Sequence, residues 1–143
     1  MSEKNETINL EDYFTADIEK EGVWFQPKIK GKLCGIEFLV TGTDTEENIV
    51  NAERFQKAVD ELNDIKDNIE AAKKRKELEA NRVAQFVKGI RAADDKEVLF
   101  GGRPLEYSEP LIQQICLKSP LIQSEILKFA VKTENFIKRK SND

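Results

Sequence analysis

Histidine is absent from the sequence, and cysteine is scarce. Without histidine the chain has no imidazole base for a Ser-His or Cys-His dyad and no imidazole ligand for zinc. Cys34 and Cys116 stand apart among apolar neighbours, so neither has the closely spaced partner that a metal clip or a redox motif needs. We interpret both as reduced core thiols. We expect no catalytic residue, no metal site and no cofactor, and we predict that the protein is not an enzyme.

Long hydrophobic runs and a surplus of positive charge are also lacking. No stretch approaches the roughly 18 apolar residues of a membrane span, and the first ten residues contain no apolar signal-peptide core. We therefore expect a cytoplasmic protein without a membrane partner. The net charge of −4 argues against a general nucleic-acid binder, which usually carries a basic surplus.

Apolar residues make up only 39% of the 143 residues, while charged residues make up 35%. Average proteins are roughly 45–50% apolar and about 25% charged. A core this lean predicts either a partly extended shape or a fold whose stability is completed by a partner, because small domains have little apolar surface to spare. We therefore expect the protein to act by binding another macromolecule.

The chain divides into an acidic leader at residues 1–21 and a single α+β domain at 22–140. Acidic residues far outnumber lysines in the leader. Low hydrophobicity with high net charge cannot offset the entropy lost on ordering, so the leader is expected to be mobile. A short apolar patch at 10–14 is the exception, since it has the composition to dock as one turn.

The hydrophobic period separates two parts of the domain. Val23-Trp24-Phe25 is prone to form a strand, and Ile36, Phe38 and Val40 alternate with residues of the opposite face. This pattern predicts a small antiparallel β unit at about 23–41. After Gly42 the period lengthens to three and four residues, which predicts a mainly helical part at about 44–140.

The segment 44–91 carries the longest helical pattern. Apolar residues follow helical spacing from Ile49 to Ile69 and again from Val83 to Ile90, whereas 71–82 is almost entirely polar. The pattern fits one long exposed helix or two helices with a hinge near Asp67. We favour two, because the polar middle has no apolar face to hold it.

Local signals mark the ends of several elements. At the start of the first long helix, Thr43 with Glu46, or Asp44 with Glu47, has the spacing of a capping box. Two adjacent glycines at 101–102 predict a minor β-hairpin over 98–107. Ser108 and Ser119, each followed by a proline, predict the starts of two last helices, the second reaching about Lys138.

Two apolar surfaces are candidates for binding a partner. One is the stripe of the last helix, which is wide for so lean a domain, and the other is the aromatic pair on the first strand. The partner-binding candidates are Ile122, Ile126, Phe129, Phe136, Trp24 and Phe25. The alternative is that the last helix packs in the core against Phe86 and Ile90.

Five stretches of the C-terminal half carry a family resemblance: 83–91, 95–99, 102–108, 117–122 and 134–136. These stretches resemble the tail assembly chaperones of long-tailed bacteriophages. The shared features are a turn with glycine, the helix start Tyr107-Ser108, a helix that begins with Pro120, and the terminal Asn135-Phe136. The opening Gly22–Phe25 and the strand pair that ends at Gly42 are also similar to members of that group. The resemblance covers most of residues 22–136. It consists of the order of these features along the chain and includes no invariant motif.

The resemblance implies a chaperone in the bacterial host cytoplasm that is absent from the mature virion. Its partner would be the tape measure protein or another phage tail protein, kept soluble until tail tube subunits polymerise around it. Many such genes also encode a longer frameshifted product. Two alternatives stay open: a structural head–tail connector or tail completion protein, and a nucleic-acid-associated regulator using the basic residues at 73–76 and 138–140. A homo-oligomer is also compatible with the sequence.

Overall fold

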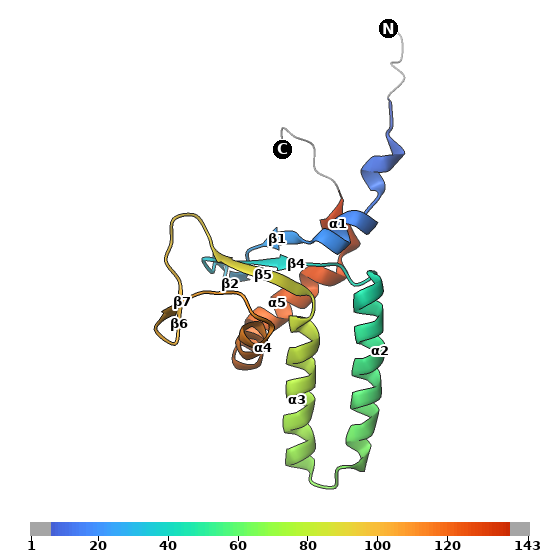
Figure 1. Ribbon diagram of the computed structural model, residues 1–143, viewed down its shortest axis with the longest axis vertical. Coiled ribbons are helices and arrows are strands. Elements are labelled where there is room, and N and C mark those ends of the chain that lie inside the picture. The colour runs from blue at the N-terminus through green and yellow to red at the C-terminus, as the bar shows by residue number, and fades with distance from the viewer. Residues whose placement is uncertain (1–6, 138–143) are drawn as a thin grey trace.

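The computed structural model of the chain describes residues 7–137. In this part of the chain a three-stranded antiparallel sheet lies beside a larger set of helices (Figure 1), so the predicted α+β class with a mainly helical part is confirmed. The central strand is β4 (Ile36–Val40), with β1 (Val23–Phe25) on one side and β5 (Val87–Ala92) on the other. The side chains of Phe38 and Val40 on β4 are fully buried, so one face of the sheet forms part of the core.

Strand β5 corrects the prediction that residues 83–90 continue a helix. The helix before it ends at Ala84, and the chain then pairs with β4 in a register that sets Phe38 opposite Ile90. Val87 and Ile90 are spaced as on a helix face, yet β-branched residues also suit a strand. Residues 87–92 form a strand because they pair with β4, about fifty residues earlier in the chain. The spacing of apolar residues within 83–90 contains no information on this distant partner.

Two long antiparallel helices form an arm that projects from the body of the protein (Figure 1). They are α2 (Glu46–Glu61) and α3 (Asn68–Ala84), joined by the short 3-10 helix η2 (Leu62–Asp64). The Asp67 side chain caps α3 by accepting hydrogen bonds from the amides of Ile69 and Glu70. The prediction of two helices with a hinge near Asp67 is therefore confirmed.

Helices α4 (Glu109–Lys118) and α5 (Pro120–Val131) pack beside the sheet and against α3. Ser108 and Ser119 cap them as predicted, each accepting a hydrogen bond from an amide three residues later. Helix α5 ends earlier than expected, at Val131, and a 3-10 helix η3 (Thr133–Phe136) follows it. The expected end of the helix at Lys138 lies outside the described residues.

The two remaining strand pairs are short hairpins. They are β2 (Lys28–Ile29) with β3 (Lys32–Leu33), and β6 (Leu99–Phe100) with β7 (Arg103–Pro104). Gly101 and Gly102 have φ angles of 61° and 80°, the left-handed region that a tight two-residue hairpin turn requires. The hairpin predicted at 98–107 is therefore confirmed.

Ordered structure begins inside the segment that was expected to be a mobile leader. A 3-10 helix η1 (Leu10–Tyr13) precedes α1 (Ala16–Glu21). Glu19 of α1 is buried and accepts a hydrogen bond of 2.9 Å from the Thr15 hydroxyl. The boundary predicted at residue 21 is thus too late, because the Gly42 amide donates a hydrogen bond of 3.0 Å to the Glu19 carbonyl and joins α1 to the domain.

The core lies between the sheet, the C-terminal half of α3 and the two helices α4 and α5. Its buried apolar side chains are Phe38, Val40, Ala80, Val83, Ala84, Phe86, Val87, Ile112, Ile115, Cys116, Ile126 and Ala130. None of the helices in residues 7–137 is long and apolar enough to cross a membrane.

Candidate functional site

The predicted partner-binding residues of the last helix lie in the core. Ile126 and Phe136 are fully buried, while Ile122 and Phe129 are partly buried and pack against the core cluster. Phe25 of β1 stacks on Phe129 with ring centroids 4.3 Å apart. In this conformation Ile126 and Phe136 offer no surface to a partner.

Trp24, the remaining candidate, lies on the opposite face of β1 from Phe25, because successive strand residues point to opposite sides. Its ring is partly exposed, and the Arg91 guanidinium lies over it at 3.9 Å from the ring centroid. Arg91 also pairs with Glu37 at 2.6 Å. The structure therefore brings the other candidates together in the core and leaves Trp24 apart from them, covered by a cation.

The arm leaves a seam between its two helices that no other element covers in the part of the chain that the structure describes. Among the described residues, α2 packs mainly against α3, and Asn48 at its base is its one buried residue. Helix α3 packs on its other side against α4 and α5. Helix α2 is therefore held at its base and along one side, and the seam between α2 and α3 stays open to solvent.

A continuous groove runs along this seam. It consists of two open hollows of about 470 Å³ and 190 Å³ that share Ala58, Leu78 and Asn81. The hollow nearer the arm tip is lined by Leu62 and Ile65 as well as by charged residues. From Asn51 to Leu62, the α2 side of the groove extends about 16 Å at 1.5 Å per residue, which suits a short helical segment.

The end of the groove near the body is cationic. Arg54 and Arg82 both line it, and neither forms an ion pair with a carboxylate among the described residues. The Arg82 guanidinium lies 5.0 Å from the centroid of the Phe55 ring, and its Nε is enclosed without a hydrogen-bond partner in the same part of the chain. Two unpaired arginines beside apolar surface favour a ligand that brings its own carboxylate.

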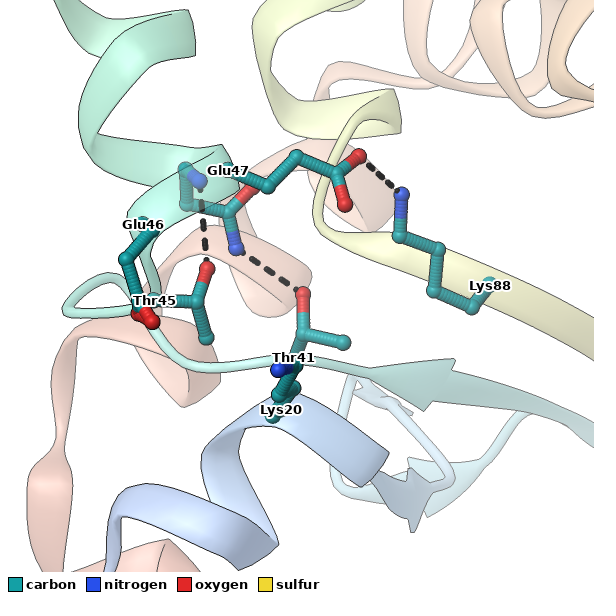
Figure 2. Close-up of a pocket in the computed structure, with 7 residues that line it drawn as sticks. Lys20, Thr41, Thr45, Glu46, Glu47 and Lys88 are labelled. Carbon is teal, nitrogen blue, oxygen red and sulfur yellow. Dashed lines mark hydrogen bonds and ion pairs between the residues drawn. The ribbon is translucent and has the colours of Figure 1, made fainter.

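A polar network fixes the base of the arm to the sheet (Figure 2). The side-chain nitrogen Nδ2 of Asn48 donates to the Gly42 carbonyl at 2.7 Å and to the Thr41 hydroxyl at 3.0 Å. That hydroxyl donates in turn to the carbonyl of Phe86, the residue before β5. The Thr45 hydroxyl caps α2 by accepting a hydrogen bond from the backbone amide of Asn48. The capping boxes predicted from Thr43 and Asp44 therefore begin two residues and one residue too early. These bonds join both ends of the arm to neighbouring strands.

The hollow beside this network measures about 90 Å³. Ligand pockets are typically about 300 Å³ or larger, so it has room for a few water molecules only. Lys88 closes one side through its 2.7 Å ion pair with Glu47 (Figure 2). We assign this joint a structural role, that of holding the arm on the body.

The groove was not among the sites that sequence reasoning identified. The apolar stripe that runs along α2 and into η2, and that includes Phe55 and Leu62, has the spacing of an ordinary core face. Nothing local in the sequence distinguishes a buried stripe from a half-covered one. The one signal of the groove in the sequence is the polar composition of 71–82. A helix with so few apolar residues cannot fully cover the apolar stripe of the helix that packs against it.

No group of three or more residues suited to hold a metal ion occurs within residues 7–137. No family model, curated protein or solved structure matches the chain. Its function is therefore inferred from its own residues.

Proposed function

We propose that the protein binds an amphipathic helical segment of another protein in the groove between α2 and α3. The observation that carries this proposal is the open seam of the arm. Towards the tip, Leu62 and Ile65 line it together with the charged side chains of Glu61, Lys74 and Glu77. Towards the body it is lined by two arginines that form no ion pair among residues 7–137. Grooves of this kind accept helices whose apolar side chains recur every three or four residues. The arginines add a requirement for an acidic residue beside that apolar face.

We further propose that the segment belongs to a client and that the protein is an assembly chaperone. An accessible apolar groove on a highly charged protein suits a partner that must be held in solution and later released. The resemblance to phage tail assembly chaperones points to the tape measure protein as the client. The groove replaces the last helix as the client site, because Ile126 and Phe136 are buried.

A matched pair of charge reversals tests the groove. Arg54→Glu with Lys74→Glu alters two exposed groove residues, whereas Lys57→Glu with Lys73→Glu makes the same charge change on the same two helices outside the groove. Exposed substitutions usually change stability by less than about 0.5 kcal/mol, so both variants should unfold at nearly the wild-type temperature.

Each variant is co-expressed with the tape measure protein, and the soluble client that copurifies is measured. We expect the groove variant to recover at least about tenfold less client, because like charges facing each other across an interface are strongly repulsive. The control variant should recover the wild-type amount. Equal recovery by the two variants would refute the groove as the client site. Salt-sensitive retention of the wild-type protein on DNA, without client binding, would instead favour a nucleic-acid-associated regulator.

A further inference from the structure

The segment that precedes α1 exposes large apolar side chains. No residue of η1 or its flanks is buried. Short acidic segments usually contain few large apolar residues, so their presence here is unusual. The exposed fractions are 72% for Ile8, 66% for Leu10, 62% for Tyr13 and 58% for Phe14. They form an apolar patch that no other residue among 7–137 buries.

The pattern of this segment matches the chemistry of the arm groove. Leu10 and Tyr13 lie three residues apart within η1 and share one face of this 3-10 turn, and Phe14 follows it in an extended conformation. Because the three residues are spaced at i, i+3 and i+4, an α-helical turn formed on docking places all of them on one face. Glu11 and Asp12 lie beside that face. A short apolar face flanked by carboxylates is the ligand that an apolar groove with unpaired arginines favours.

The segment is too far from the groove of its own copy to reach it. Residues 7–14 and the arm lie at opposite ends of the longest axis of the molecule, with the body between them (Figure 1). The chain from Thr15 onward is held by α1, whose Glu19 is buried. An encounter between the segment and a groove therefore involves two copies.

We infer that residues 8–14 of one copy dock in the α2–α3 groove of a second copy. Leu10, Tyr13 and Phe14 contact the apolar side chains of Leu62, Ile65 and Leu78, which lie among charged residues. Glu11 and Asp12 face Arg54 and Arg82 at the other end of the groove. The contact joins two different surfaces, so it closes into a dimer when both copies exchange segments and otherwise extends into a chain of copies. The inference rests on the groove being a docking site, as proposed above, and it adds that a second copy covers the groove until a client displaces it.

Self-association of the full chain tests the inference by light scattering over a series of concentrations. We expect the wild-type protein to associate as concentration rises. Leu10→Ser with Phe14→Ser removes half of the apolar patch at exposed positions and should weaken association at least about tenfold. A wild-type protein that stays monomeric throughout would overturn the inference.

A mixing experiment separates this contact from other modes of association. The groove variant Arg54→Glu with Lys74→Glu keeps its segment, and the segment variant Leu10→Ser with Phe14→Ser keeps its groove. Each should be monomeric alone, and the two should form a one-to-one complex when mixed. Association of the segment variant with itself would indicate arm-to-arm pairing and overturn the inference.

Client recovery distinguishes a failure of this inference from a failure of the proposed function. The segment variant should keep the tape measure protein soluble at least as well as the wild-type protein, because its groove is intact and uncovered. Normal client recovery without self-association would overturn the inference alone. Self-association through the groove without any client recovery would refute the proposed function alone.

Discussion

Asn48 is the residue whose removal should loosen the arm most directly. Its side-chain nitrogen donates to the Gly42 carbonyl at 2.7 Å and to the Thr41 hydroxyl at 3.0 Å, and the residue is buried. In Asn48→Ala both hydrogen bonds are lost. The Thr41 hydroxyl keeps its own bond to the Phe86 carbonyl, but the Gly42 carbonyl is left buried without this donor.

The structure sets the size of the effect. A net hydrogen bond contributes about 0.5–1.5 kcal/mol, and an acceptor left buried without a partner costs about 1–3 kcal/mol. The Asn48 Oδ1 is itself buried without a hydrogen-bond partner among the described residues, so its removal offsets part of this loss. We therefore expect Asn48→Ala to lower the free energy of unfolding by about 2–4 kcal/mol. At roughly 3 °C per kcal/mol for a domain of this size, the melting temperature should fall by about 6–12 °C.

Circular dichroism during heating measures the melting temperature, and Asn63→Ala at an exposed position of η2, at the tip of the arm, is the matched control. The control should stay within about 0.5 kcal/mol of the wild type. Hydrogen exchange at temperatures well below melting should also show faster exchange in the first turns of α2 for Asn48→Ala. A variant as stable as the control, with unchanged exchange in α2, would refute the role of this network.

Three further changes test other parts of the fold. Phe136→Ala should cost about 3–5 kcal/mol, measured by denaturant unfolding, because the ring is fully buried against Phe129; a cost below about 1 kcal/mol would contradict its place in the core. Gly42→Ala should cost about 1–3 kcal/mol by the same measurement, since a Cβ there would overlap the buried Glu19 carboxylate, and an unchanged stability would contradict that contact. Burial raises the pKa of the Cys116 thiol to about 12, so thiol reagents at neutral pH should label it only after unfolding; mass spectrometry showing equal labelling of native and unfolded protein would contradict this.

The elements that could be predicted from the sequence are those with local signals. The change of hydrophobic period after Gly42 separates β4 from α2, and the break near Asp67 separates the two arm helices. Serine before proline marks the starts of α4 and α5, and two glycines mark the β6–β7 turn. Each of these signals acts through hydrogen bonds or φ angles within a few residues.

The features that the sequence could not supply depend on distant partners. Strand β5 forms because β4 offers it a ladder of hydrogen bonds, and the helical spacing of Val87 and Ile90 conceals this. The sequence left open whether the stripe of α5 packs in the core or binds a partner, and Phe25, about a hundred residues earlier, helps to place it in the core by stacking on Phe129. The groove on the arm likewise arises where two helices leave a seam open, and neither helix reveals it alone.

Site-specific photocrosslinking tests most directly whether the arm groove holds the client. A photoreactive benzoylphenylalanine replaces Lys74 in the groove or, as a control, the exposed Lys132 between α5 and η3, in cells that also produce the tape measure protein. The proposal predicts a covalent adduct with the client from position 74 and none from position 132. An adduct from position 132 alone, or no difference between the two positions, would contradict the binding of the client by the arm.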